Sequence, residues 1–573
     1  MITTPNPVAS AVTSTAMSRE EAIDHVLRND PRFSIGQTRI WGNPFTVFTN
    51  APDNLQALLK EAVGNYPSRD FLIYQDERWT YSEFAAEVNR AAHMLTSELS
   101  VQPGDRIALA MRNYPELAIL LMAIVSIGAV VVPLNAWWSG EELAFAVRDS
   151  DVRLVFADGD RYAALRPQVN AHPVTLIGVR DATSAPLQYA DLLSRSSDES
   201  WPEAVVAPDD DFAVLYSSGS SGRPKGVLLT HRGAISSIHS WRMVEEVAAL
   251  MAPEAAANQA GLPAYLIVTP LFHVTALHSM FLRGLALGAR LVLMYKWDPE
   301  EAVAIVEREQ ITRFVGVPTQ SAELGRTAEK LGVALNSLDT VGSGGAKRPA
   351  AEVLQLAQRF PGAKIATGWG MTETNSLGIL LSGPEYVDNP DAAGRLTPPL
   401  QEMRIVDEAG NDVPAGDVGE LVVRSPANMR GYLNLPEETR ESLRDGWLYT
   451  GDLARVDESG LIYIVDRKKS IIIRGGENIS CLEVEGALHQ HPAIAEACVF
   501  PVADDRLGEI VGAAVYVQEG YDMDQASIRD FLKERLAAFK VPERIWLWHT
   551  PLPKGGTGKL DRKVLQGLCQ SRD

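Results

Sequence analysis

The chain has 573 residues and a formal net charge of −20 at pH 7. A single hydrophobic core rarely serves so long a chain, so we expect two or more domains, and the hydrophobic share of 46% is ordinary for a globular protein. Because binding to a nucleic-acid backbone needs a basic face, the acidic charge argues against nucleic acid as a partner. It does not exclude a small anion, for which a few local cations suffice.

Membrane and export signals are weak along the whole chain. Residues 1–17 lack the basic start and apolar core of a secretory signal, and the three cysteines suit a reducing, cytoplasmic compartment. The run 117–134 just reaches membrane-spanning length, but an internal glycine and proline interrupt it. We expect a helix over 114–127 that is capped at Asn113, then a buried strand over 129–132, and no integral membrane segment.

Helical and strand-like patterns alternate along the first half of the chain. After a mixed extension over 1–50, strands are expected at 71–74, 106–110, 130–133 and 154–157, with helices at 54–62, 81–99, 114–127 and 139–150. Such alternation predicts a layered α/β body with a largely parallel sheet. Residues 419–432 read as strands and turns of a small β-barrel. We therefore expect three parts: the N-terminal extension 1–50, a large domain over 51–465, and a small mixed α and β domain over 466–573.

The most informative stretch follows a buried strand over Phe212–Tyr216. It reads Ser217-Ser218-Gly219-Ser220-Ser221-Gly222-Arg-Pro-Lys225-Gly226. Glycines permit close backbone approach, serines supply hydroxyl donors and Lys225 adds a cation, which together can wrap a polyphosphate. A flexible linker rarely follows a buried strand directly. A P-loop ATPase needs Ser or Thr after its lysine, and Gly226 stands there instead.

Four later segments carry glycines and polar residues, and the first two of them follow apolar strands, at whose ends sites in α/β sheets lie. They are Pro270-Leu-Phe-His273, Gly342-Ser-Gly-Gly-Ala346, Gly368-Trp-Gly-Met-Thr-Glu373 and Gly446-Trp-Leu-Tyr-Thr-Gly-Asp452. An aromatic ring can stack on a base, a carboxylate can hold Mg²⁺, and an aspartate can accept both hydroxyls of a ribose. Taken singly, the histidine and the glycine turns have equally good structural explanations.

The C-terminal part adds two more such segments. A charged break, Asp466-Arg467-Lys468-Lys469, is followed by Gly475-Gly476-Glu477-Asn478, and the chain ends in Pro553-Lys-Gly-Gly-Thr-Gly-Lys559. In this order, from 217 to 562, the segments resemble the motifs of the adenylate-forming superfamily and, within it, of the acyl-CoA synthetases. Trp369 departs from the pattern, which usually has Tyr there; stacking survives that change, but the phenol hydroxyl is lost.

The resemblance implies a fold and a reaction. The fold is a large N-terminal domain of layered α/β subdomains with a small β-barrel, and a small mobile α+β lid that turns about Asp466. The reaction uses Mg²⁺ and ATP to convert a carboxylic acid into acyl-AMP with release of pyrophosphate, and then transfers the acyl group to coenzyme A. The second step would follow rotation of the lid and withdrawal of Lys559.

The resemblance also implies roles for individual residues. ATP would be bound by Ser217, Ser218, Gly219, Ser220, Ser221, Gly222, Lys225, Gly344, Gly345, Ala346, Gly368, Trp369, Gly370, Met371, Thr372, Asp452, Ile464, Arg467 and Lys559. Catalytic roles fall on Lys559, Thr372, Glu373 and His273, with Glu373 and Ser217 as metal ligands. The acyl pocket would include His273, Gly342, Gly344 and Gly370, and the coenzyme A site Gly475, Gly476, Glu477 and Lys540.

The acid is expected to be hydrophobic, and a fatty acid first of all, since residues 273–281 are largely apolar and residues 342–346 are small. A carrier protein is the alternative acceptor, although Gly475-Gly476 and Phe539-Lys540-Val-Pro favour coenzyme A. A catalytically inactive relative that only binds is a further alternative, against which Lys559 and Glu373 argue. Chain length, branching, an aromatic ring and homodimer formation stay open.

Overall fold

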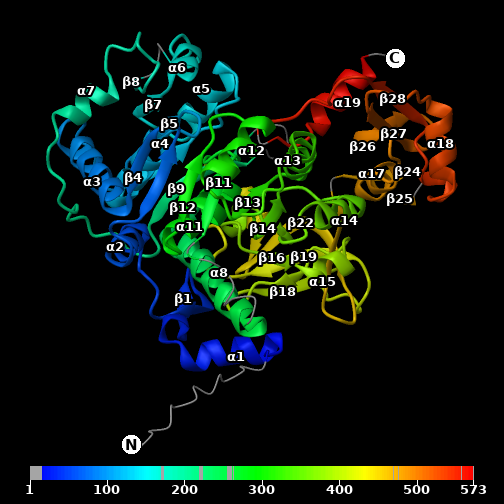
Figure 1. Cartoon of the computed structure of the whole chain (residues 1–573), viewed down its shortest axis with the longest axis horizontal. Helices are drawn as coiled ribbons and strands as arrows, with labels where there is room; N and C mark the ends of the chain where they lie inside the picture. The colour runs from blue at the N-terminus through cyan, green and yellow to red at the C-terminus, as the bar shows by residue number, and fades with distance from the viewer. Residues whose placement is uncertain are drawn as a thin grey trace, which may run out of the picture.

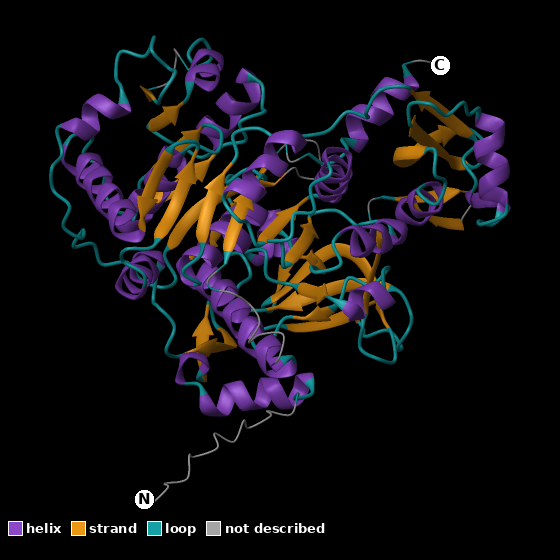
Figure 2. Ribbon diagram, viewed as in Figure 1, coloured by secondary structure: helices purple, strands orange, loops and turns teal. Residues whose placement is uncertain are grey.

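The computed structural model describes residues 16–169, 173–217, 224–253, 261, 263–468, 470–474, 477–556 and 558–571. Two large sheets and a smaller antiparallel sheet form the body, and a smaller domain that begins beyond β23 (Ile462–Arg467) lies beside it (Figure 1). The helices and strands of both parts are distinguished by colour in Figure 2. The layered α/β class expected from the alternating pattern is thereby confirmed.

The first sheet has seven strands, of which five run parallel. Its order is β20 (Gly431–Tyr432), β10 (Lys225–Thr230), β9 (Asp211–Ser217), β6 (Val130–Pro133), β5 (Arg106–Ala110), β7 (Leu154–Ala157) and β8 (Thr175–Gly178). Strands β9, β6, β5, β7 and β8 are parallel, whereas β10 and β20 run antiparallel to their neighbours. The carboxyl ends of the parallel strands therefore meet at one edge.

The second sheet has nine strands with a parallel centre. Its order is β17 (Arg395–Leu396), β16 (Ile379–Ser382), β15 (Lys364–Trp369), β14 (Thr340–Gly344), β13 (Arg313–Gly316), β11 (Ala264–Ile267), β12 (Arg290–Leu293), β3 (Asp70–Tyr74) and β4 (Glu77–Thr80). From β15 to β3 all neighbours are parallel. Strands β13, β14 and β15 end side by side, so the loops that follow them share one edge.

Helices fill the space between and around these sheets. They are α2 (Leu55–Asn65), α3 (Tyr81–Ser97), α4 (Pro115–Ser126), α5 (Gly140–Asp149), α6 (Gly159–Leu165), α7 (Tyr189–Ser194), α8 (His231–Met251), α10 (Val274–Ala276), the π-helix η2 (Leu277–Leu282), α11 (Arg283–Ala286), α12 (Pro299–Arg308), α13 (Pro318–Leu331), α14 (Ala350–Arg359), the short turn η3 (Thr372–Thr374), α15 (Pro384–Asp388) and α16 (Pro436–Ser442). The largest core joins α2, α3 and α4 to strands of both sheets.

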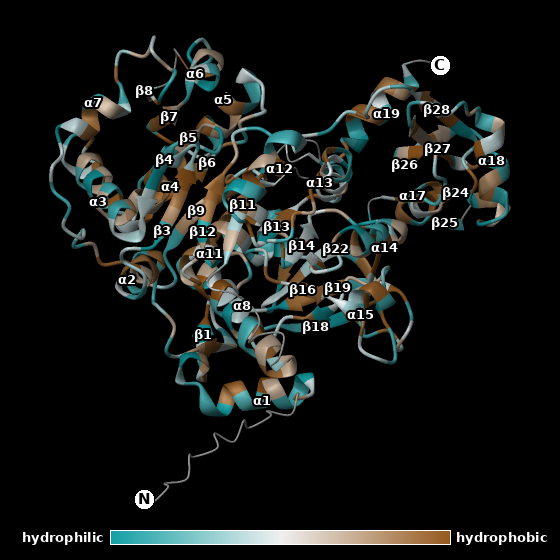
Figure 3. Ribbon diagram, in the orientation of Figure 1, coloured by the Kyte–Doolittle hydropathy of each residue, from teal (hydrophilic) through white to brown (hydrophobic). Residues whose placement is uncertain are grey.

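Helix α4 explains the apolar run that reaches membrane-spanning length. It is buried on nearly all sides between the sheets, and the hydrophobic colouring of Figure 3 gathers on it and on the strands beside it. No helix among the described residues combines the length and the apolar character of a bilayer-spanning segment. The predicted cap at Asn113 is wrong: Tyr114 stands at the N-cap, and the Asn113 amide bonds instead to the backbone of Thr269 and Leu271, at 2.9 Å each.

The predicted barrel is an antiparallel sheet. It contains β18 (Glu402–Val406), β19 (Gly419–Arg424), β22 (Trp447–Val456), β21 (Leu443–Arg444) and β23, and no pairing among its described strands closes it. Residues 431–432, expected in the barrel, form β20 and pair with β10 in the first sheet. That pairing joins segments more than 200 residues apart, which a local pattern does not reveal.

The first and last described helices lie on opposite sides of the body (Figure 1). The N-terminal extension forms α1 (Arg19–Asn29), η1 (Pro31–Phe33) and the hairpin β1 (Ile35–Ile40) with β2 (Asn43–Phe48), and it packs on α8. The C-terminal domain pairs β25 (Glu477–Ser480), β24 (Ile471–Arg474), β27 (Gly508–Val517), β26 (Ile494–Asp504) and β28 (Arg544–Trp548), with α17 (Cys481–Leu488), α18 (Gln525–Lys533), η4 (Ala538–Lys540) and α19 (Arg562–Gln570) around them.

Candidate active site

The serine-rich segment begins where strand β9 ends. Ser217 is the last residue of β9 and pairs with Lys225, the first residue of β10. Ser218, Gly219, Ser220, Ser221 and Gly222 lie outside the described residues. The Lys225 ammonium lies 5.1 Å from the centroid of the Tyr432 ring. The strand pair thus presents one hydroxyl and one cation at the edge where ligands of such sheets bind.

The turn after β15 carries the candidate metal ligand. Glu373 lies in η3 and is 6% exposed, and its Oε1 accepts a hydrogen bond from the Tyr432 hydroxyl at 2.9 Å. Burial raises the pKa of Glu373, and the Tyr432 hydrogen bond opposes that shift. Thr372, also buried, begins the same turn. Carboxylate and hydroxyl oxygens are the ligands that Mg²⁺ prefers.

A buried aspartate lies under the end of the same strand. Asp452 on β22 accepts the Trp369 indole N–H at 2.7 Å, and its other oxygen pairs with Arg467 at 3.2 Å. Burial raises the pKa of Asp452, and the Arg467 guanidinium opposes it. Ile464, on the strand that carries Arg467, pairs with Ala454. Three residues predicted to bind the nucleoside, from three strands, are thereby joined by direct contacts.

The glycine turn after β14 receives the last signature lysine. Gly345 has φ +78°, a conformation that favours glycine, and a Cβ atom there would lie 2.8 Å from the Lys559 Nζ, so the end of the lysine side chain lies against this turn. Gly344 faces Thr275, because a Cβ atom added at Gly344 would lie 3.9 Å from the Thr275 Cγ2. Ala346 is exposed. A Cβ atom on Gly370 would lie 2.4 Å from the Ser376 carbonyl oxygen, which fixes glycine there too.

The electrostatics around Lys559 are unusual for a lysine. Burial, with a smaller contribution from Arg467, lowers the pKa of Lys559 to about 8. His273, at the start of α10, accepts the Thr275 backbone N–H at Nδ1, 3.2 Å away. Burial first, and then Lys559 and His278, lower the pKa of His273 to about 3, so it is neutral at physiological pH. The C-terminal domain therefore places one cation beside a neutral histidine and the glycine turn.

Comparison with known proteins gives a family for this arrangement. A family model described as "AMP-binding enzyme" matches residues 59–433, and a second, "AMP-binding enzyme C-terminal domain", matches residues 483–559. The chain belongs to the AMP-binding enzyme family. It is 34% identical to a feruloyl-CoA synthase from Amycolatopsis sp. over 86% of this chain and 94% of that protein. It is 30% identical to a long-chain-fatty-acid–CoA ligase from Bacillus subtilis over 89% and 94%.

Solved structures give the same result. The o-succinylbenzoate CoA synthetase of Bacillus subtilis with its acyl-adenylate superposes with a TM-score of 0.75 at 28% identity, covering 89% of this chain and 97% of that one. The same protein with ATP and magnesium gives 0.74, covering 89% and 99%. The superfamily resemblance of the motifs is thereby confirmed. This AMP-binding enzyme is an AMP-forming acid–thiol ligase that uses ATP, Mg²⁺ and coenzyme A.

The motif resemblance predicts that Lys559 serves acyl-AMP formation, and its lowered pKa then predicts a basic limit to that step. Below about pH 8 the lysine is an ammonium, and above it the charge is lost, so kcat/KM for pyrophosphate release should fall as pH rises through about 8. Bound carboxylate and phosphate both favour the ammonium form of Lys559. The falling limb of the pH profile of kcat should therefore lie at a higher pH than that of kcat/KM. Lys559→Arg, which stays charged, should remove the limb, and Lys330→Arg, at an exposed lysine, should retain it. A limb at pH 8 that persists in Lys559→Arg would contradict this assignment.

The residues expected to bind coenzyme A are not gathered with the others. Lys540 pairs with Glu483 at 2.6 Å, and Glu477 lies on the exposed hairpin of β24 and β25. Both contacts are within the C-terminal domain, and Gly475 and Gly476 lie outside the described residues. Asp466 is buried between the two parts and accepts hydrogen bonds from Ser480 and Leu482. The structure thus brings several of the described residues expected to bind ATP and the acid into contact with one another, but does not do so for those expected to bind the thiol.

Sequence reasoning missed several residues of this site. Asn135 and Trp137 follow β6 and lie against Gly556 of the last signature segment: a Cβ there would be 2.7 Å from Asn135 Oδ1 and 3.0 Å from Trp137 Cβ. Tyr432 contacts both Lys225 and Glu373. Asn135 and Trp137 could have been predicted from their position, because they follow a parallel strand that ends at the same edge of the sheet as β9. For Tyr432, no local pattern shows its strand partner.

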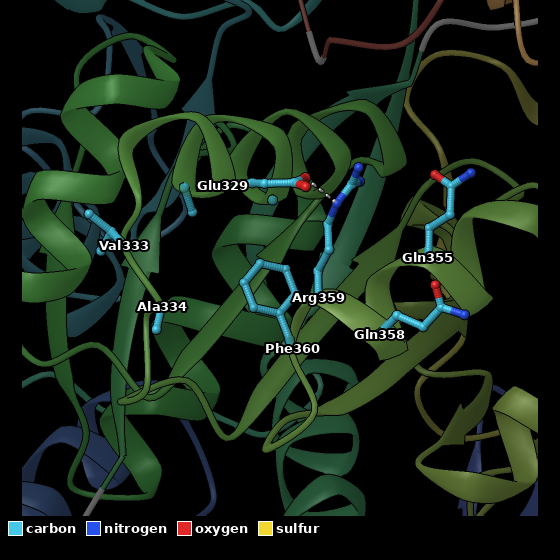
Figure 4. Close-up of a pocket in the computed structure, with 9 residues that line it drawn as sticks. Glu329, Val333, Ala334, Gln355, Gln358, Arg359 and Phe360 are labelled. Atoms are coloured by element: carbon cyan, nitrogen blue, oxygen red, sulfur yellow. Dashed lines mark hydrogen bonds and ion pairs between the residues drawn. The ribbon is translucent and has the colours of Figure 1, made fainter.

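A separate hollow lies between α13 and α14 (Figure 4). It has a volume of about 460 Å³ and is lined by Gln355, Gln358 and Phe360 and by the ion pair of Arg359 with Glu329, at 3.1 Å. Figure 4 shows these side chains around an open surface depression. None of the predicted site residues lines it, so it is distinct from the cluster around Lys559.

Proposed function

We propose that this enzyme activates a hydrophobic carboxylic acid, and that its preferred substrate is a fatty acid. The observation that carries the proposal is an uncharged wall behind the η3 turn. Helix α8 packs there, since a Cβ on Gly233 would lie 2.5 Å from the Asn375 side chain. The buried residues of this described helix between His231 and Met243 include no Asp or Glu. None of these buried residues between His231 and Met243 would hold the ammonium of an amino acid.

The core behind this wall has neutral polar atoms and apolar side chains, all fully buried. Burial lowers the pKa of His231 to about 3 and that of His278 to about 4, so both are uncharged at neutral pH. Leu277, Met280 and Phe281 are fully buried in the π-helix η2, which continues from the predicted acyl residue His273. Apolar and neutral surroundings favour an acyl chain whose only charge is its carboxylate.

An aryl acid is the second candidate. Relatives include the feruloyl-CoA synthase described above and a 4-coumarate–CoA ligase from Nicotiana tabacum, at 29% identity. His278 Nδ1 is buried and has no hydrogen-bond partner among the described residues, while Nε2 bonds to Asn375 at 2.9 Å. A phenol hydroxyl would satisfy that nitrogen, which an alkyl chain would not.

We assign the first step to the gathered cluster. The acid's carboxylate oxygen bonds to the α-phosphorus of ATP, and the bond to pyrophosphate breaks. Lys559 neutralises the two anions as they meet, and Thr372 donates to the α-phosphate. Asp452 and Arg467 hold the ribose, and Trp369 stacks on adenine beside Gly344 and Gly345. No protein nucleophile is required.

The remaining donors suit the phosphates and the metal. Ser217 and Lys225 hold the β- and γ-phosphates, together with residues 218–222. No group of three or more His, Cys, Asp or Glu in the described part of the chain could hold a metal. Glu373 and Ser217 fit Mg²⁺ nonetheless, because this ion is usually held by one or two carboxylates plus substrate phosphates. When bound, it neutralises charge on the phosphates.

We assign the second step to a rotated C-terminal domain. The boundary proposed at Asp466 separates a large domain over 51–465 from a lid over 466–573. Rotation would withdraw Lys559 and bring Gly475, Gly476, Glu477 and Lys540 to the acyl-AMP. The coenzyme A sulfur then bonds to the acyl carbon, the thiol proton passes to solvent, and AMP leaves. A cytoplasmic location is consistent with three buried cysteines that form no disulfide.

The test is carboxylate-dependent pyrophosphate release from Mg-ATP over a panel of fatty, hydroxycinnamic and amino acids, with and without coenzyme A. We expect turnover that needs a hydrophobic acid and coenzyme A, with fatty acids preferred. A preference for hydroxycinnamic acids would select the second candidate. Release that stops after one turnover, with coenzyme A making no difference, would indicate a carrier protein as acceptor. Turnover with amino acids would contradict the proposal.

A further inference from the structure

One side chain touches both candidate phosphate-binding elements. The Tyr432 hydroxyl donates to Glu373 Oε1 at 2.9 Å, and the ring face of the same residue lies 5.1 Å from the Lys225 ammonium. Glu373 comes from the turn after β15 in the second sheet, and Lys225 opens β10 in the first. Tyr432 therefore spans the junction of the two sheets.

The backbone around Tyr432 is fixed at both ends. The backbone of residues 429–433 bonds to the η3 turn and to β10. The Met429 N–H donates to the Glu373 carbonyl at 2.7 Å. The Arg430 N–H donates to the Leu228 carbonyl at 2.9 Å, and the Leu433 N–H donates to the Gly226 carbonyl at 2.7 Å. The Tyr432 N–H itself donates to the Thr439 hydroxyl at 2.9 Å. A segment held this way has few alternative positions for its side chain.

The two contacts of Tyr432 have different chemistry. The Tyr432 hydroxyl donates a hydrogen bond to a charged group, the Glu373 carboxylate. That bond occupies one carboxylate oxygen of Glu373 and orients the other. The ring face is electron-rich and attracts the ammonium of Lys225. Phenylalanine would keep the second contact and lose the first, whereas leucine would lose both.

We propose that Tyr432 is a positioning residue for acyl-AMP formation, which holds the Lys225 ammonium and the Glu373 carboxylate in register for the phosphates and Mg²⁺ of ATP. The inference rests on the proposed function, since it takes the roles of Lys225 and Glu373 from it. It adds a residue that neither contacts the substrate nor belongs to the phosphate loop, and it assigns separate tasks to ring and hydroxyl.

Calorimetric binding of the non-hydrolysable α,β-methylene analogue of ATP, with and without Mg²⁺, separates these tasks. For Tyr432→Phe we expect affinity within about twofold of wild type without Mg²⁺ and about tenfold weaker binding with it, because only the bond to a charged group is lost. Tyr432→Leu should bind about fivefold more weakly even without Mg²⁺. Thioester formation from supplied acyl-AMP should be unchanged in both, because that step involves neither the β- nor the γ-phosphate.

Tyr216→Phe is the matched control. Tyr216 lies on β9, two strands from β20 in the same sheet, and its hydroxyl also donates to a carboxylate, Asp149, at 2.8 Å, but on the opposite face. It should bind the analogue as wild type does. In a Glu373→Gln background, Tyr432→Phe should have no further effect on Mg²⁺-dependent binding, because its partner is already altered.

Three results would overturn the inference. They are unchanged Mg²⁺-dependent binding in Tyr432→Phe, equal binding of the Phe and Leu variants without Mg²⁺, and a full additive effect of Tyr432→Phe in the Glu373→Gln background. The last holds even if Tyr432→Leu fails to fold. Failure of the wild type itself to bind the analogue is a separate outcome, which would refute the assigned ATP site and the inference with it.

Discussion

Lys559→Ala should reduce acyl-AMP formation by about 100-fold or more while leaving thioester formation from supplied acyl-AMP within about threefold of wild type. The Lys559 Nζ lies at Gly345 in the described arrangement, where a carboxylate and an α-phosphate would meet. Two anions that approach without this cation repel each other in a buried site, where charges interact more strongly than in water. The measurements are pyrophosphate release with acid and ATP, and thioester yield from acyl-AMP and coenzyme A.

Lys554→Ala is the matched control for this variant. Lys554 lies in the same segment and is paired with Glu496 at 2.7 Å and more loosely with Glu323 of the body at 3.9 Å. Partly exposed ion pairs contribute little, so its loss should change either step by about fivefold at most. Equal loss of both half-reactions in Lys559→Ala would refute the proposed division between the two steps. So would full adenylation activity in the same variant.

How far the sequence predicts such a site depends on the range of the contacts. The segments that end at Ser217, Gly344 and Trp369 lie at strand ends, and parallel pairing within each sheet brings such ends to one edge. Asp452 instead lies inside β22 of the antiparallel sheet. Asn113 shows where local reasoning fails. Its position before a helix is typical of a cap, but its amide is held by Thr269 and Leu271, more than 150 residues away. Hydrogen bonds to distant backbone groups can thus outweigh the preference of a side chain for capping the helix next to it.

The position of the C-terminal domain is a different kind of problem. Its motifs predict that Lys559 acts at the site, but the composition of residues 466–573 does not say which face the domain presents to the body. The domain approaches the body closely where glycine leaves space, at Gly345 against Lys559 and at Gly556 against Trp137. These contacts depend on the shapes of both surfaces. For the same reason, the residues predicted for coenzyme A could be named from motifs but not placed together.

Trp369 shows that a departure from a family pattern can carry its own chemistry. The motif predicts an aromatic ring for stacking, and the exchange of Tyr for Trp loses a hydroxyl. The structure shows that the indole N–H is used, because it donates to Asp452 at 2.7 Å. The carboxylate is also paired with Arg467. Two protein donors therefore orient the residue to which we assign the ribose.

Asp452→Asn should lower kcat/KM for ATP by about 100-fold and reduce the preference for ATP over 2′-deoxy- and 3′-deoxy-ATP to about twofold. A buried carboxylate that hydrogen-bonds a ribose hydroxyl is left unpaired by the deoxy analogue, and this penalty is the source of the preference. The amide replaces one acceptor with a donor and meets the Trp369 N–H or the Arg467 guanidinium unfavourably. Pyrophosphate release measured with the three nucleotides at concentrations below KM reports both effects.

Two further variants locate the cause of the loss. Trp369→Phe keeps a ring for stacking and removes only the N–H, so it should cost about tenfold and relax the preference in part, since Arg467 still orients the carboxylate. Asp457→Asn, at an exposed turn of the same sheet where the carboxylate bonds to Ser459 and Tyr463, should change neither quantity by more than about twofold. A full preference for ribose in Asp452→Asn would place the ribose elsewhere. In that case the Trp369–Asp452–Arg467 contacts would only join β15 to the antiparallel sheet, and Trp369→Phe would lower the melting temperature and leave nucleotide selectivity unchanged.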